Sequence, residues 1–332
     1  MRSPNSSQRR LKHISYAKYG YIFSIPFILA YLIFSLYPTI YTAILGFTDC
    51  QGVGNTSLNI LDEPFANFKS ILENETFKIS VKNTVVIWIL NFIPQMTMAL
   101  ILTAWFTSRR NELKGKGVFK VIFYMPNIIT AASVALLFYS MFQSPVGAVN
   151  DILQRFGIID TPYNFHVDKT ASKLVVAFIQ FLTWYGNTMI VLISGVLGIS
   201  PDIFEAADID GANGVQTFFK ITIPNLKTVL LYTLVTSLVG GLNMYDIPKM
   251  YNNGGPDNST LTSSVFIYNQ AFGTNYLYNR AAAASMLIFI LIAICSAVLF
   301  YIMRDKDEAM RKKEIKAEKK ASKVRGGING KN

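Results

Sequence analysis

The sequence predicts an all-α integral membrane protein with six transmembrane helices. Two observations predict this class. Of the 332 residues, 51% are hydrophobic and only 15% are charged, whereas a soluble domain carries about 25% charged residues. The apolar residues are also gathered in six long runs, each close to the roughly 20 residues that a helix needs to cross about 30 Å of hydrocarbon.

These six runs give the expected spans. Inside them the one charged side chain is that of Lys120, at the first turn of the third span, where it can reach the lipid headgroups. Pro26 and Pro38 lie in the first span, Pro94 in the second and Pro126 in the third, and we expect kinked but continuous helices there. The spans cover residues 21–47, 85–106, 118–142, 174–198, 228–245 and 281–303.

Basic residues are concentrated on one side of the predicted membrane. If both termini and alternate loops share a side, that side holds 23 of the 31 Lys and Arg residues, which identifies it as the cytoplasm. The chain then divides into a basic cytoplasmic tail (1–18), a six-helix membrane domain (19–303) and a second basic cytoplasmic tail (304–332). The net charge of +11 therefore reflects topology and contact with membrane lipid, and it argues against nucleic-acid binding.

One cytoplasmic loop, residues 199–227, lacks this positive charge. It holds two lysines against four acidic residues, so we expect a protein partner rather than lipid headgroups, which favour a basic surface. Pro201 suits the start of a short helix, and Gly211 can adopt positive φ in a turn. A second short helix should follow and end at Pro224. The loop is predicted to be a docking element of two short helices joined by a glycine turn.

The same loop carries an extended motif. Glu205, Ala206 and Ala207 are followed by Asp210, Gly211 and Ala212, and then by Phe218, Ile221 and Pro224. This pattern resembles the EAA loop of the permease subunits of binding-protein-dependent ABC importers. The resemblance implies that the loop docks on a cytoplasmic ATPase, with Glu205 as the polar anchor and Gly211 as the hinge. The implied coupling residues are Glu205, Ala206, Ala207, Asp210, Gly211, Ala212, Phe218 and Pro224.

Motifs elsewhere extend the resemblance over nearly the whole chain. They include residues 36–38, 46–49, 123–126 and 251–256, and they are similar to carbohydrate importers, on the side of the larger, maltose-type permease subunit. The resemblance implies the type I importer permease fold in a bacterial cell membrane. It implies as partners a second homologous permease, two ABC ATPase subunits, an extracytoplasmic sugar-binding protein and the sugar. ATP and Mg would bind the ATPase, so this chain is expected to hold no cofactor.

Polar and aromatic residues inside the spans are candidates for the substrate path, because such residues are costly in a membrane and an aromatic face with amide neighbours suits a sugar. Asn243 also matches a position that lines the sugar site in maltose-type relatives. The alternative interpretation is that each polar residue bonds a neighbouring helix. The candidates are Trp184, Tyr185, Asn187, Asn243, Tyr245 and Asp246. We expect Gly186, Gly195 and Gly198 to allow close helix packing.

The sequence also bears on two other classes of function, a membrane enzyme and an ion-coupled carrier. The chain has no phosphate-binding G-x-x-x-x-G-K-[ST] motif, no metal-ligand spacing and no nucleophile–base pair, so we expect no enzyme activity and no metal site. A self-contained ion-coupled carrier stays open as the alternative function. It would need acidic residues or histidines at mid-membrane, and the predicted spans contain none.

Overall fold

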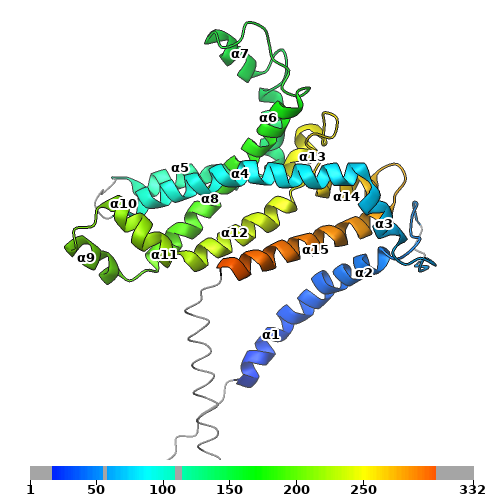
Figure 1. The fold of residues 1–332 in the computed structure, drawn as a ribbon, viewed down its shortest axis with the longest axis horizontal. Coiled ribbons are helices and arrows are strands. Elements are labelled where there is room, and N and C mark those ends of the chain that lie inside the picture. Colours follow the sequence, from blue (N-terminus) through cyan, green and yellow to red (C-terminus); the bar gives the residue numbers. More distant parts are fainter. Residues whose placement is uncertain (1–16, 55–57, 109–113, 304–332) are drawn as a thin grey trace, which may run out of the picture.

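The computed structural model describes residues 17–54, 58–108 and 114–303, and within these ranges the chain is a helical bundle (Figure 1). The predicted tails at 1–18 and 304–332 lie outside the described residues, apart from Ala17 and Lys18 at the start of the first helix. Among the described residues, five helical segments are long and apolar enough to cross a membrane, and a bent pair of helices gives a sixth if the pair is taken as one span. The predicted all-α class is therefore confirmed.

The membrane helices follow the apolar runs. The first span joins α1 (Ala17–Tyr31), the π-helical turn η1 (Leu32–Leu36) and α2 (Tyr37–Leu45). The others are α4 (Glu75–Thr107), the pair α5 (Lys116–Ile128) and α6 (Ala131–Met141), α8 (Lys169–Leu197), α12 (Lys227–Leu242) with α13 (Asp246–Asn252), and α15 (Tyr278–Met303). Short helices lie between them: α3 (Ala66–Glu73), α7 (Ala148–Arg155), α9 (Pro201–Ile209), α10 (Gly214–Thr217), η2 (Phe218–Thr222), α11 (Ile223–Asn225) and α14 (Ser263–Phe272).

The third span is not a continuous helix, so that prediction was wrong. The axes of α5 and α6 differ by 87°. Pro126 does not itself mark the break, which falls at Ile129 and Thr130, where the Thr130 hydroxyl accepts a hydrogen bond from the Ser133 amide and starts a new helix. Asn127 Nδ2 also donates to the Thr183 carbonyl of α8 at 2.6 Å, which fixes the corner against the bundle.

The fifth span also differs from its predicted end at residue 245. It continues through α13 to Asn252, and so includes Asp246 and Lys249. The helix is interrupted between Asn243 and Tyr245, which have non-helical or distorted backbone angles. Lys249 Nζ is held by Asn269 Oδ1 of α14 at 3.0 Å.

Buried apolar side chains form three clusters, and α4 contributes to each: one with α12, α14 and α15, one with α6, α8 and α13, and one with α8 alone among the long helices. Gly186 of α8 lets α5 approach, because a Cβ there would lie 3.1 Å from the Phe123 carbonyl oxygen, and a Cβ on Gly195 would lie 2.8 Å from Leu226. Close packing at these two glycines was predicted and is confirmed. Gly198 instead ends α8 and makes no close contact with another helix. The bundle has one end marked by α9 and α10 and the opposite end by α2 and α3, while α6 and α7 project from its side (Figure 1).

Candidate coupling site and translocation path

The loop between α8 and α12 folds into the expected docking element. Pro201 occupies the first turn of α9, where a missing N–H costs no hydrogen bond. Asn213 caps α10 in a reciprocal box: its side chain accepts from the Gln216 amide at 2.9 Å, and Gln216 Oε1 accepts from the Asn213 amide at 2.8 Å. Each short helix is thus started by a local signal. The two form one compact element at the end of the bundle (Figure 1).

The turn after α9 depends on Gly211, as predicted. Its φ is +76°, in the left-handed region, and the turn places the Ala212 amide 3.0 Å from the Ala207 carbonyl oxygen and the Gly211 amide 3.2 Å from that of Asp208. These bonds satisfy carbonyls that the end of a helix otherwise leaves unpaired. A Cβ on Gly211 would meet nothing within 4 Å. Glycine is required here for its backbone angle and not for space.

The end of the element differs from the prediction. Pro224 does not stop the second helix, because the π-helical turn η2 and α11 carry the chain through it to Asn225. Pro224 lies at the start of α11, where its missing N–H is tolerated. The helical path then bends at Leu226, which is 1% exposed and packs under Gly195 of α8. The element is therefore fixed directly to the bundle at its exit.

The predicted coupling residues fall into two groups. Glu205, Ala206, Asp210, Gly211 and Pro224 are exposed. Ala207 is buried against the chain, and Ala212 and Phe218 are half-buried. The other two acidic residues of the element, Asp202 and Asp208, are exposed as well. Four acidic side chains are therefore exposed on the element, and one of them, Asp208, lines the groove on its bundle side.

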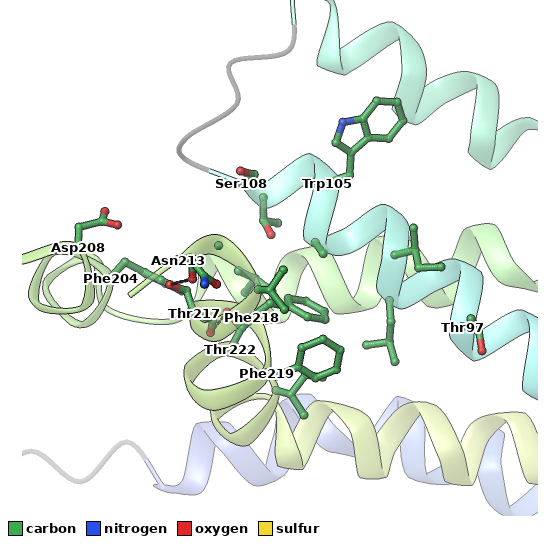
Figure 2. A pocket seen from close by; sticks show the side chains of 18 residues that line it. Thr97, Trp105, Ser108, Phe204, Asp208, Asn213, Thr217, Phe218, Phe219 and Thr222 are labelled. Carbon is green, nitrogen blue, oxygen red and sulfur yellow. Dashed lines mark hydrogen bonds between the residues drawn. The ribbon is translucent and has the colours of Figure 1, made fainter. Parts of the chain in front are cut away.

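The inner side of the element borders a groove of about 810 Å³ (Figure 2). Phe204, Phe218 and Phe219 line one wall, and the last turns of α4, including Trp105, line the other. Phe218 thus points to the bundle side of the element.

The six substrate-path candidates do not form one cluster. The edge of the Trp184 ring lies against Gly240 of α12, where any Cβ would overlap it. Tyr185 is buried and stacks on Phe181 at 5.3 Å between ring centroids. Asn187, Asn243 and Asp246 keep exposed side chains, and Asn243 Nδ2 bonds the Val239 carbonyl of its own helix at 2.9 Å. Tyr245 contacts the Tyr268 ring, with 5.2 Å between centroids. Substrate contact stays a prediction for all six residues, and Trp184 and Tyr185 in addition make these packing contacts.

A buried polar cluster was missed from the sequence. Gln95 of α4, 1% exposed, donates through Nε2 to Thr188 Oγ1 of α8 at 2.8 Å, and its Oε1 accepts from Ser237 Oγ of α12 at 3.4 Å. Trp88 of α4 also lies on Gly241, next to the Trp184–Gly240 contact. Gln95 inside an otherwise apolar run was a signal that could have identified this cluster. Three helices are joined here by hydrogen bonds and by ring-on-glycine packing.

Within the described ranges, no group of three or more His, Cys, Asp or Glu side chains is arranged to hold a metal ion.

The chain is similar to known transport proteins over most of its length. The family described as binding-protein-dependent transport system inner membrane component matches residues 83–306, which includes the coupling element. The chain belongs to this family. The lactose transport system permease protein LacF of Rhizobium radiobacter is 32% identical over 86% of this chain and 94% of its own length. The maltodextrin permease MalC of Streptococcus pneumoniae is 31% identical over 90% of this chain and 72% of its own.

Solved structures support the fold. A chain of a bacterial ABC transporter that imports the acidic polysaccharide alginate superposes with a TM-score of 0.72, at 21% identity, over 86% of this chain and 95% of its own. A second structure of the alginate transporter, in complex with a periplasmic protein that holds an alginate pentasaccharide, gives a TM-score of 0.70 at 21% identity, over 86% of this chain and 94% of its own. The family member described here therefore has the fold of an ABC importer permease and is a multi-pass membrane component.

Proposed function

We propose that this chain is the permease subunit of an ATP-driven importer of oligosaccharides or multiple sugars, and that it forms half of the translocation pathway. The observation that carries the proposal is the acidic helix–turn–helix element at 201–225, which lies between two spans of a family-type bundle. Relatives named for lactose and maltodextrin transport support the sugar class.

In this proposal the chain transmits motion from the ATPases to the membrane helices and catalyses no reaction itself. Two ABC ATPase subunits bind ATP and Mg, and one of them binds the exposed acidic side chains of α9 around Glu205. Closure of the ATPases then pushes α9, and the push passes through η2 and α11 into α12. Because α12 packs on α8 at Gly195 and on α4 through the Gln95 cluster, the three helices move together and the pathway changes its open side.

The remaining partners follow from the same arrangement. A second homologous permease supplies the other half of the pathway, and an extracytoplasmic sugar-binding protein delivers the substrate at the outer loops. Both termini are placed in the cytoplasm, as the distribution of basic residues indicates. Asn243 and Asp246, at the interruption of the fifth span, are the side chains we expect to contact the sugar.

Energised membrane vesicles test the proposal against an ion-coupled carrier. The structure adds Asp246 to the fifth span, and an ion-coupled carrier would depend on this exposed carboxylate. Sugar uptake should require ATP and the binding protein, and should persist when ionophores collapse the proton and sodium gradients. Uptake that follows the ion gradients and is indifferent to ATP would refute the importer. Asp246→Asn would then be expected to abolish the coupling.

A further inference from the structure

An aromatic cluster at the outer end of the fifth span encloses one histidine. The His166 ring lies between Tyr139 of α6, with 4.4 Å between ring centroids, and Tyr251 of α13, at 5.1 Å. Tyr139 and Tyr251 also meet edge to face at 6.2 Å. Three segments far apart in the sequence therefore converge on a single imidazole.

The hydrogen bonding of His166 defines its tautomer. Nε2 lies 3.1 Å from the Tyr139 carbonyl oxygen, which can only accept, so Nε2 carries the proton. In the neutral ring Nδ1 is then a bare acceptor. It is buried and has no hydrogen-bond partner among the described residues.

Tyr251 presents the complementary group. Its side chain is 1% exposed, and its hydroxyl likewise lacks a partner within the part of the chain that the structure describes. A buried donor and a buried acceptor on neighbouring rings each lose hydration unless they are paired. The centroids of the two rings lie 5.1 Å apart, and pairing the hydroxyl with Nδ1 would satisfy both groups.

We propose that Tyr251 Oη donates a hydrogen bond to His166 Nδ1, directly or through one water, and that this bond is a latch between α13 and the outer arm, residues 143–168. The arm is braced internally, because Asn150, 0% exposed, bonds the Gln143 carbonyl and both the amide and carbonyl of Tyr163. These bonds hold the two flanks of the arm together as one folded unit. His166 and Tyr251 are positioning residues that connect this unit to the span leaving the coupling element.

Protonation of the imidazole opposes the latch. A proton on Nδ1 replaces the acceptor with a donor, which then faces the Tyr251 hydroxyl. Burial lowers the pKa of His166, with the Tyr139 carbonyl acting in the opposite direction. On its own segment the nearby titratable groups are Tyr163 and Asp168, and the Asp168 carboxylate accepts from the Ala171 amide at 2.6 Å, which holds its pKa below the usual range. The latch is thus complete above the ordinary histidine pKa of about 6.5 and is lost as the pH falls through the lowered value.

Nuclear magnetic resonance of the full chain in nanodiscs tests the latch, since the sequence has only two histidines. In a His13→Gln background, ¹⁵N-labelled His166 should hold its proton on Nε2 at pH 7.5 and titrate below 6.5. Tyr251→Phe should raise the His166 pKa toward 6.5 and speed hydrogen exchange in the arm about fivefold, the scale of one hydrogen bond. Tyr139→Phe is the matched control, because the Tyr139 contact uses its backbone carbonyl.

The result that overturns the latch is a proton on Nδ1 at neutral pH, or the same titration and arm exchange in both tyrosine variants. The consequence for transport rests on the proposed function and is measured separately: Tyr251→Phe should reduce uptake at pH 7.5 to the level that wild type shows at pH 5.5. Because resonance and exchange do not depend on transport, loss of the importer function would leave the latch test intact. An unchanged His166 signal with reduced uptake would refute the latch.

Discussion

Replacement of Gly211 by valine isolates the backbone requirement of the coupling turn. A side chain at this position has open space, so the cost comes from φ of +76° alone. The left-handed backbone conformation costs a residue with a Cβ about 1–2 kcal/mol, and the cost for a β-branched residue lies at the upper end of this range. Such a cost disfavours the turn by a factor of roughly 5–30. The hydrogen bond from Ala212 to Ala207 would be lost in the same event.

Gly214→Val provides the matched control. Gly214 lies three residues away, has equally open surroundings and begins α10 without positive φ. Both variants should insert normally, as judged by immunoblot of washed membranes, and only Gly211→Val should lose ATP-driven sugar uptake in reconstituted vesicles. Gly211→Asn should retain partial uptake, because asparagine tolerates this region better. Normal uptake by Gly211→Val, or equal loss in both valine variants, would refute the role of the turn.

Three further perturbations test other parts of the structure. Asn243→Ala should weaken sugar-stimulated uptake more than basal ATP hydrolysis, and an unchanged apparent sugar affinity would count against a sugar contact at Asn243. Gly241→Ala should lower the thermal unfolding temperature of the purified chain by overlap with Trp88, at a cost of about 1–3 kcal/mol, whereas Gly117→Ala, which has open space, should not. Gln95→Leu should lower the free energy of unfolding by about 0.6–1.7 kcal/mol, the size of interhelical hydrogen bonds in membranes. Equal unfolding curves for the variant and the wild type would show that the cluster contributes no stability.

The long-range organisation of the fold could be predicted because it depends on length and hydropathy. Apolar runs of about 20 residues must span the membrane as helices, and each predicted run has a matching helix or helix pair. Proline did not show where a span breaks. Pro94 lies inside a continuous α4, whereas the third span breaks three residues after Pro126, where Thr130 caps a new helix. The capping bond and the Asn127 contact with α8 decide the break, and the contact is a tertiary one.

The coupling element was predictable because its signals are local. Pro201 starts a helix and Gly211 ends it by their own backbone preferences. The path candidates were less predictable, since a polar or aromatic residue in a span can face a neighbouring helix or a cavity. Trp184 lies against Gly240 of a neighbouring helix, a pairing set by how far α12 is shifted along α8. No local pattern encodes that shift.

Recovery of partners with the solubilised full chain tests the central claim, that α9 couples this permease to an ATPase. Wild type, Glu205→Arg and Asp62→Arg are purified side by side and the copurifying proteins identified by mass spectrometry. Asp62→Arg makes the same charge change at an exposed position between α2 and α3, far from α9 along the chain. The account predicts that an ABC ATPase and a second permease copurify with wild type and Asp62→Arg, and that the ATPase is depleted with Glu205→Arg. A chain that purifies alone in all three preparations, or an ATPase retained equally by Glu205→Arg, would contradict it.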